Sequence, residues 1–331
     1  EIPRLLAAAS PRRAATAPPS GFFPSEVDVH RESQFQAWVG IMEGCDNFCA
    51  FCVVPFTRGR ERSRPPEEIL REIADLQRRG YREITLLGQT VNSYGSKLDP
   101  PVTFAALLRR IDRQVAGAMR VRFTTSHPKD VTPELAEALA NLPAVCPHVH
   151  LPVQSGSSRT LARMARGYSR EEYLEKTRLL ASARRDLALS TDLIVGFPGE
   201  TEEDFQETLS LMREVRFDSC FAFKYSPRPG TPAIGLPDPV PEEIGADRLS
   251  RVLRLQDEIS LARNLAWIDR EVEILVDRAL SKRDSGLGAG RTPQNKIVHF
   301  GGGCVEEGKL ANVKITKATP HHLKGVLTAS L

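Results

Sequence analysis

The sequence lacks any apolar run close to the roughly 20 residues that a membrane-spanning helix requires. Its first residues also lack the pattern of a secretory signal peptide. Six cysteines in 331 residues are too few for a disulfide scaffold. These absences argue against a membrane-spanning protein and against a small disulfide-rich one, so we expect a cytoplasmic enzyme with no membrane partner.

The composition itself is ordinary for a globular protein, with 41% hydrophobic and 26% charged residues and enough length for more than one domain. Residues 269–331 hold ten Lys and Arg against seven Asp and Glu, and the rest of the chain holds 35 of each sign. The whole net charge of +3 therefore lies in the last segment. A basic terminal domain is suited to phosphate, although such a small excess is also common on surfaces without a nucleic-acid role.

Three cysteines stand close together at the spacing C-x3-C-x2-C, at Cys45, Cys49 and Cys52. Soft thiolate ligands select iron–sulfur clusters or zinc. A structural zinc site needs a fourth protein ligand nearby, but the next histidine downstream is His127, and His30 precedes a predicted strand. The spacing thus favours a 4Fe–4S cluster with three thiolate-bound irons and one open iron over a closed zinc site.

Residues 36–226 alternate between short apolar runs and amphipathic helical patterns. Strands are predicted at 37–42, 83–87, 120–124, 148–153, 188–195 and 219–225. Between them, capping boxes at 169–172 and 201–204 mark helix starts. Six such βα units predict an α/β fold, a partial (βα)6 barrel, in which ligands bind at the carboxyl ends of the strands. The cysteine loop follows the first strand, where this rule places a site.

The last third of the chain changes pattern. A long helix is predicted over 241–267, followed by short β runs at 271–276, 296–300, 310–315 and 325–328 with glycines between them. These runs predict a small antiparallel β-barrel. At the other end, the stretch 10–20 is rich in Pro, Ala and Arg and cannot bury a core; we expect a linker after a missing domain, with a disordered terminus as the alternative.

Four stretches carry a family resemblance: 45–65 (CDNFCAFCVVPFTRGRERSRP), 86–95 (LLGQTVNSYG), 150–157 (HLPVQSGS) and 192–201 (DLIVGFPGET). The cysteine loop followed by βα units resembles the radical S-adenosylmethionine (SAM) superfamily. The flanking residues resemble its methylthiotransferases, in particular the MiaB branch that acts on tRNA. The last segment, with GRTPQN at 290–295, resembles a TRAM domain. We therefore expect a linker over 1–30, a radical SAM core over 31–268 and a TRAM-like RNA-binding domain over 269–331.

The resemblance implies that Cys45, Cys49 and Cys52 are catalytic and bind one 4Fe–4S cluster, and that SAM binds its open iron. It also implies a second, auxiliary cluster on an N-terminal domain that this chain lacks. Cys146, Cys220 and Cys304 are too scattered to replace it. The implied reaction is methylthiolation at C2 of N6-isopentenyladenosine next to the tRNA anticodon, with SAM as radical source and methyl donor.

The strand-end rule and the resemblance together predict SAM contacts at Gly88, Gln89, Asn92, Ser126, Gln154, Ser155, Arg166, Asp192 and Gly196. A plain βα turn is a fair alternative for Gly88, Gln89, Asn92 and Gly196 taken singly, and Arg166 could equally be a solvated surface arginine. RNA contacts are predicted at Arg58, Arg60, Arg291, Lys296, Lys314, Lys317 and Lys324. Arginines alternate from 58 to 64, and salt bridging to nearby glutamates is an even competitor there, with Arg58 expected to be the most structural.

The expected partners are the tRNA anticodon loop, a reductant such as flavodoxin or ferredoxin, and a sulfur donor, with the chain itself a monomer. Three alternatives stay open. In the first two, the same chemistry acts on threonylcarbamoyladenosine in tRNA or on an aspartate of a ribosomal protein. The basic terminal domain favours RNA over the protein substrate. A non-catalytic iron–sulfur RNA-binding protein is the alternative of a different class.

Overall fold

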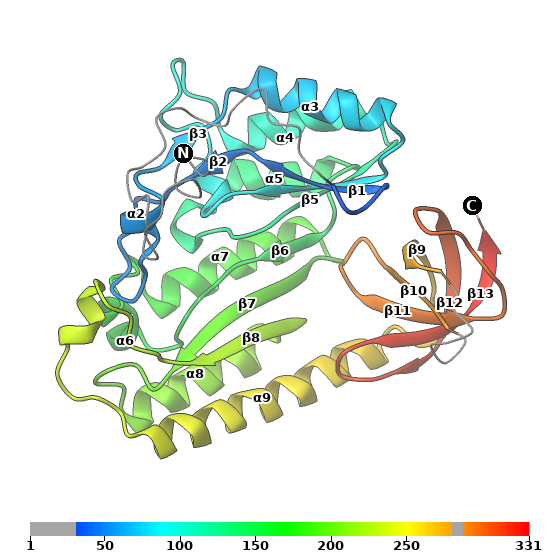
Figure 1. The fold of residues 1–331 in the computed structure, drawn as a ribbon. Helices are drawn as coiled ribbons and strands as arrows, with labels where there is room; N and C mark the ends of the chain where they lie inside the picture. Colours follow the sequence, from blue (N-terminus) through cyan, green and yellow to red (C-terminus); the bar gives the residue numbers. More distant parts are fainter. Residues whose placement is uncertain (1–30, 280–286, 331) are drawn as a thin grey trace, which may run out of the picture.

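The computed structural model describes residues 31–279 and 287–330, and the expected linker over 1–30 lies outside them. The described residues form a six-stranded partial barrel and a five-stranded closed barrel (Figure 1). Within the described ranges, no helix combines the length and apolarity needed to cross a bilayer.

The partial barrel consists of two three-stranded parallel sheets. The first has the order β1 (Gln36–Gly40), β4 (Glu83–Leu87), β5 (Arg120–Phe123). The second has the order β6 (His148–His150), β7 (Ala188–Val195), β8 (Ser219–Lys224). A single bridge between Val121 and Val145 links the two, and β1 and β8 remain as the edge strands. The predicted α/β partial barrel is confirmed, although β6 ends at residue 150 rather than 153.

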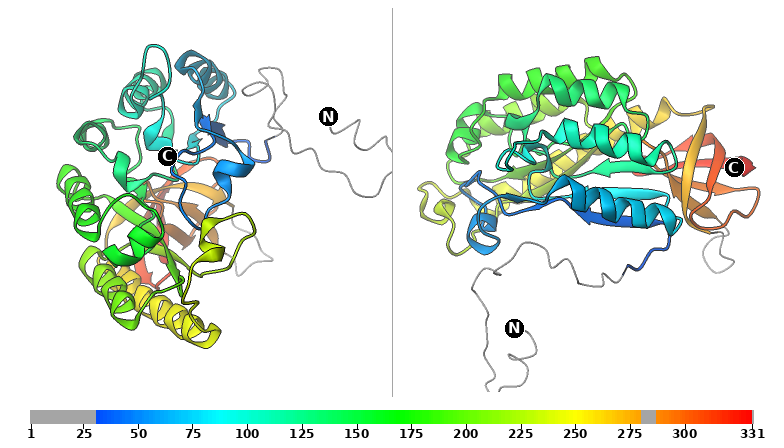
Figure 2. Two further views of the ribbon diagram at one scale, coloured as in Figure 1. Left: turned by 90° about the vertical axis from the view of Figure 1, so that its left-hand side faces the viewer. Right: turned by 90° about the horizontal axis from the view of Figure 1, so that it is seen from above.

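Helices cover the outer face of these sheets as an open crescent (Figure 2). They are α3 (Pro66–Arg78), α4 (Phe104–Val115), α5 (Pro133–Asn141), α6 (Ser158–Arg163), α7 (Arg170–Ala183), α8 (Glu202–Val215) and α9 (Glu242–Leu265). Both predicted capping boxes are present, since the side chains of Ser169 and Thr201 each accept a hydrogen bond from the third helical N–H. Alternate residues of each strand meet the apolar stripes of the helices in one continuous core.

The cysteine loop is bordered by short elements at the carboxyl end of the first sheet. Strands β2 (Met42–Glu43) and β3 (Arg62–Ser63) pair antiparallel on either side of it, and α2 (Val54–Thr57) follows the third cysteine. Three 3-10 turns, η1 (Val91–Ser93), η2 (Pro128–Asp130) and η3 (Pro232–Gly235), lie in the loops after β4, β5 and β8.

The small barrel closes in the order β10 (Gly288–Arg291), β11 (Ile297–Gly301), β13 (Leu323–Ser330), β12 (Leu310–Ala318), β9 (Glu271–Arg278). The predicted small β-barrel is confirmed, and its strands pair antiparallel except for β11 and β13, which pair parallel. Strand β10 was not predicted, because its glycines resemble a loop. Gly290 is required there by packing, since a Cβ would lie 2.5 Å from the carbonyl oxygen of Leu275.

The small barrel packs against the amino ends of the large sheets, opposite the cysteine loop (Figure 1). Arg122, in β5, donates to the carbonyl oxygens of Thr292 and Pro293 at 2.9 and 2.8 Å, and to the carboxylate of Glu83 at 2.8 Å. Lys296 forms an ion pair with Asp218, just before β8, at 2.7 Å. All the charged groups in these contacts are nearly buried.

Candidate active site at the cysteine loop

Main-chain hydrogen bonds hold the cysteine loop between two distant segments. The N–H of Ala50 donates to the carbonyl oxygen of Met164, at the end of α6, at 2.9 Å. The N–H of Ala233, in η3, donates to the carbonyl oxygen of Ala50 at 2.8 Å. These residues and Phe197 form a small buried apolar cluster beneath the loop, and Phe51 meets the Phe197 ring edge-on with centroids 6.5 Å apart. The loop is thus fixed from both sides by backbone and by apolar contacts.

The start of the loop depends on a glycine. Gly44 has φ +75°, and a Cβ there would lie 2.2 Å from the carbonyl oxygen of Arg60. That close approach lets the N–H of Cys45 donate to the carbonyl oxygen of Gly59 at 3.2 Å. Asp46 then accepts from the N–H of Glu61 at 3.2 Å and pairs with Arg60 and Lys97. A larger residue at position 44 would push the first cysteine away from the β3 segment.

The three cysteines of the loop have free thiols, which differ in burial and in their polar neighbours. Cys49 is buried, while Cys45 and Cys52 are partly buried. Arg166 donates to the Cys49 sulfur at 3.2 Å. Burial raises the pKa of the Cys52 thiol, so its thiolate requires a positive partner. Metal ions bound by all three sulfurs would supply that charge.

The donor set fits a cluster better than a single ion. Within residues 31–279 and 287–330, no three His, Cys, Asp or Glu side chains converge tightly enough to hold one metal ion. In a cubane each thiolate binds a different iron, so the sulfurs stand further apart than around a single tetrahedral ion. Three thiols without a fourth protein ligand therefore fit a 4Fe–4S cluster with one open iron.

Arg166 is the most constrained of the predicted SAM residues. Its guanidinium is buried and donates to the Cys49 sulfur, to the carbonyl oxygen of Pro152 at 2.9 Å and to the hydroxyl of Tyr168 at 3.0 Å. All three guanidinium nitrogens thus donate hydrogen bonds within the protein. The structure places this side chain against the cysteine loop, in contact with one of its sulfurs.

Three buried polar atoms near the ends of β4 and β5 have no hydrogen-bond partner: Oε1 of Gln89, Oγ of Ser126 and Nε2 of His127. Burial lowers the pKa of His127 to about 2, so its ring is neutral. Its Nδ1 accepts from the N–H of Lys129 at 3.3 Å, which leaves the proton on Nε2. An unpaired buried polar group costs about 1–3 kcal/mol, so these atoms are suited to a polar ligand. His127 was not predicted as a site residue.

Other predicted SAM contacts have structural partners instead. The Asn92 side chain exchanges two hydrogen bonds of 2.8 Å with the backbone of His127. Ser155 is fully buried, where its hydroxyl meets Thr208 at 3.4 Å and accepts from the N–H of Ser157 at 3.2 Å. Both side chains thus tie loops together, and a direct contact of either with SAM stays a prediction.

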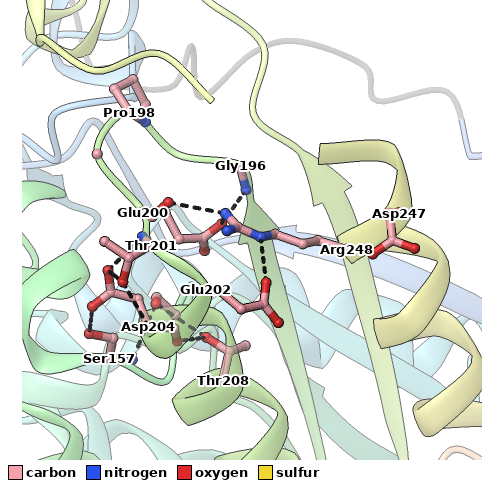
Figure 3. Close-up of polar contacts among 12 residues, drawn as sticks. Ser157, Gly196, Pro198, Glu200, Thr201, Glu202, Asp204, Thr208, Asp247 and Arg248 are labelled. Carbon is pink, nitrogen blue, oxygen red and sulfur yellow. Dashed lines mark hydrogen bonds and ion pairs between the residues drawn. The ribbon is translucent and has the colours of Figure 1, made fainter. Parts of the chain in front are cut away.

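Glycines were predicted for close approach to SAM, and the structure gives different reasons for two of them. A Cβ on Gly88 would lie 2.3 Å from the Met42 side chain, so packing against the β2 segment requires the glycine. Gly196 has φ +70°, and its N–H donates to Glu200 at 2.6 Å. Arg248, from α9, in turn donates to the same carboxylate at 2.8 Å (Figure 3). The turn after β7 is thus held rigidly by a buried ion pair, and the N–H of Gly196 is already bonded.

Gln154 and Asp192 lie on the inner side of the second sheet. Gln154 has φ +75°, and its backbone bonds to the neighbouring strand through Asp192 and Ile194 at 2.9 Å each. Asp192 lies three residues before the end of β7 and contacts Nε2 of His150 at 3.3 Å. It is therefore deeper than the residues of the strand-end loops.

The predicted RNA-binding residues divide into exposed and buried ones. Arg58, Lys314 and Lys317 are exposed, and Lys324 lies opposite Lys317 on the neighbouring strand. Arg60 is exposed but pairs with Asp46. Arg291 pairs with Asp277 at 3.6 Å.

Two expectations about the basic residues are wrong. Lys296 is buried between Asp218 and Asn264, with both contacts under 3 Å, so it cannot reach RNA. Arg58 is not the most structural of the alternating arginines. Arg64 is, since it pairs with Glu68 and Glu72 across the start of α3.

Comparison with known proteins gives two family matches. The sequence model of the radical SAM superfamily matches residues 39–212, and that of the TRAM domain matches residues 268–328. The chain is 50% identical over 302 residues to the tRNA-2-methylthio-N(6)-dimethylallyladenosine synthase of a Thermoanaerobacter species, which covers 91% of this chain and 64% of that protein. It is 50% identical over 299 residues to the synthase of the same name from Clostridium botulinum, covering 90% and 66%. The chain thus spans slightly less than two thirds of these relatives.

Solved structures share the fold at low identity. The cobalamin-containing radical SAM methyltransferase TsrM from Kitasatospora setae superposes with a TM-score of 0.51 at 19% identity, over 60% of this chain and 38% of that one. Coproporphyrinogen III oxidase (HemN) from Escherichia coli superposes with a TM-score of 0.52 at 13% identity, over 85% and 66%. These likenesses concern the fold alone.

Proposed function

Because this chain belongs to the radical SAM superfamily, we propose that its cysteine loop binds a 4Fe–4S cluster and SAM for methylthiolation of a tRNA adenosine. When bound, the cluster supplies an electron that cleaves SAM into methionine and a 5′-deoxyadenosyl radical. The observation that carries the proposal is the position of three free thiols beside unpartnered buried polar atoms at one end of the barrel.

Within this proposal, the three cysteines are the protein ligands of the cluster. Arg166 donates a charge-assisted hydrogen bond to the Cys49 sulfur and offsets its negative charge. Asn47 donates to the Cys45 sulfur at 3.5 Å, and the Thr90 hydroxyl lies equally close to it. Hydrogen bonds to thiolate sulfurs tune the reduction potential of such clusters. Arg166, Asn47 and Thr90 would therefore influence how readily the cluster is reduced.

The unpartnered atoms of Gln89, Ser126 and His127 would bind the polar methionine part of SAM. Gln89 and Ser126 offer acceptors and donors for its amino and carboxylate groups, and the neutral His127 offers an N–H. The rigid turn that begins at Gly196 would border the adenine with its main chain, since Phe197 is buried beneath the cysteine loop. Gly88, Asn92, Gln154 and Ser155 would act indirectly, by holding the loops in which these atoms lie.

The substrate in this proposal is N6-isopentenyladenosine next to the tRNA anticodon. Its support is the name of the relatives that are 50% identical and the TRAM match at residues 268–328. Exposed Lys314 and Lys317 and the half-buried Lys324 would contact phosphate, together with Arg58 near the loop. Sulfur insertion would further require an auxiliary cluster, a sulfur donor, and a reductant such as flavodoxin or ferredoxin.

Release of 5′-deoxyadenosine from SAM tests the proposal directly. Anaerobically reconstituted protein with dithionite and SAM should yield it, and Cys49→Ser should not. Protein that binds iron and SAM yet never forms deoxyadenosine would instead be a non-catalytic iron–sulfur RNA-binding protein. Nucleoside mass spectrometry of a deletion strain then assigns the substrate, since unchanged 2-methylthio-isopentenyladenosine would contradict our choice.

A further inference from the structure

The inner side of β6–β8 carries polar and aromatic side chains that lie before the strand ends. In β8, Cys220 and Ala222 pack on the main core, so the alternate residues face the other way. Those residues are Phe221 and Phe223, which are 58% and 55% exposed. Side chains of this size are rarely exposed in pairs on one strand face without a function.

Asp192 lies next to this aromatic pair. The strand register places Phe221 opposite Asp192 and Phe223 opposite Ile194. His150 connects the two kinds of side chain: its ring meets Phe221 edge-on with centroids 6.1 Å apart, and its Nε2 contacts Asp192 at 3.3 Å. The Asp192 carboxylate thus lies beside the two phenyl rings. It precedes the end of β7 by three residues, which is about 10 Å at 3.3 Å per residue.

Two histidines and a serine border Asp192 on one side. Nε2 of His150 lies 3.3 Å from the Asp192 carboxylate, and Nδ1 of the same ring lies 3.0 Å from the Ser190 hydroxyl. That hydroxyl also lies 3.1 Å from Nε2 of His148, and burial lowers the pKa of His148 to about 3, so the His148 ring is neutral. The Asp192 side chain remains 27% exposed, so its carboxylate is open to a further donor.

We propose that this surface binds the N6-alkylated adenine of the RNA substrate. Asp192 accepts the single N6–H, while Phe221 and Phe223 cover the alkyl chain. The inference rests on the proposed function and names the part of the chain that selects the base. It also moves Asp192 from the predicted SAM contacts to the substrate.

Charge and polarity favour this occupant over its closest competitor. An N6-isopentenyl adenine presents one donor beside an apolar group, which matches one acceptor beside two phenyl rings. A threonylcarbamoyl group carries a carboxylate, which Asp192 repels and which the phenyl rings cannot bind. The surface therefore discriminates between two modified adenosines that occur in the same kind of loop.

Binding of three anticodon stem-loop RNAs to the full chain tests the inference. The RNAs differ only in one adenosine, which is unmodified, N6-isopentenylated or N6-threonylcarbamoylated. We expect the isopentenylated RNA to bind about tenfold more tightly than the unmodified one. Replacing both Phe221 and Phe223 with alanine should bring the two affinities within about twofold of each other. Because both rings are largely exposed, their truncation leaves the core intact.

Asp192→Asn removes the negative charge with little change of shape. This variant should bind the threonylcarbamoylated RNA roughly threefold or more tightly than the wild type does. Leu265→Ala, at an exposed apolar residue of α9, is the matched control and should keep the wild-type ratios. Equal wild-type affinity for isopentenylated and unmodified RNA would overturn the inference, as would an alanine pair that keeps the preference. Deoxyadenosine release is measured separately in the absence of RNA. Its failure would contradict the proposed function, whereas the relative affinities for the three RNAs would still test the base preference.

Discussion

Two sets of buried polar residues, one at each end of the large barrel, differ in their hydrogen bonding, although Nε of Arg263 and Oε1 of Gln256 near the amino end also lack a partner. At the carboxyl end, Gln89, Ser126 and His127 each have a buried atom without a partner, beside three free thiols. At the amino end, Arg122 and Lys296 are equally buried, but each has several hydrogen-bond or ionic partners. Unpaired groups cost stability and persist where a ligand completes them, whereas paired ones hold structure together.

The ion pairs at the amino end also make the stability of the protein depend on pH. Burial alone would raise the pKa of Asp218, yet Lys296 and Arg263 hold it below its usual value. An acidic group with a depressed pKa stabilises the protein above its unfolded pKa, and this contribution is lost as the pH falls through the folded value. The buried ion pairs at the amino end thus stabilise the contact between the two barrels, whereas the carboxyl end is suited to bind a ligand.

The largest expected effect is at the carboxyl end. Serine at Cys45, Cys49 or Cys52 should abolish cluster binding, because an alcohol does not replace a thiolate on iron. Iron and sulfide analysis of anaerobically reconstituted protein should fall from about four irons per chain to nearly none. Cys304→Ser removes an exposed thiol far along the chain and serves as the control. Full iron content in any of the three loop variants would break the assignment of this end as the site.

The amino end should respond in stability instead. Lys296→Ala leaves the buried Asp218 with Arg263 as its remaining cationic partner and should cost about 3–5 kcal/mol of unfolding free energy. Denaturant unfolding measures this loss, and Lys314→Ala, at an exposed lysine, should stay within about 0.5 kcal/mol of wild type. Iron content should not change. A variant that unfolds normally but loses iron would reverse the roles given to the two ends.

The smallest expected effect concerns the outer surface of the small barrel. Replacing Lys317 and Lys324 with alanine should weaken stem-loop RNA binding and reduce the slope of log K against log salt by about 1 to 2. Lys309→Ala, at an exposed lysine elsewhere on the barrel, is the control. An unchanged salt slope in the double variant would show that RNA contacts the chain elsewhere.

Local patterns were sufficient to predict the partial barrel and the location of the cysteine loop. Strand alternation, capping boxes and a three-cysteine spacing are all short-range signals, and the corresponding elements are present. The parallel pairing of β11 with β13 was missed because it depends on contacts between segments that are not consecutive. Strand β10 was missed because its glycines are required by packing against Leu275, which sequence alone does not reveal.

The errors at the site have a similar cause. Lys296 looked like a surface lysine because its partner Asp218 lies far away in the sequence. Asn92 looked like a ligand contact because a side-chain amide after a strand is typical of one, yet it bonds to the backbone of His127. His127 was overlooked because one histidine is a weak signal. Its importance follows from burial and from an unpaired nitrogen, which only the folded chain defines.

The placement of the small barrel at the end opposite the cysteine loop has a consequence for which molecules the chain can select. The two ends are separated by about the length of β7, which at 3.3 Å for each of its eight residues is roughly 26 Å. A free nucleoside is too short to touch the lysines of the small barrel and the loop together, whereas a folded stem-loop is not. Under the proposed function, the fold would therefore favour an adenosine within a folded RNA, because only then can phosphates of the stem reach the lysines of the small barrel.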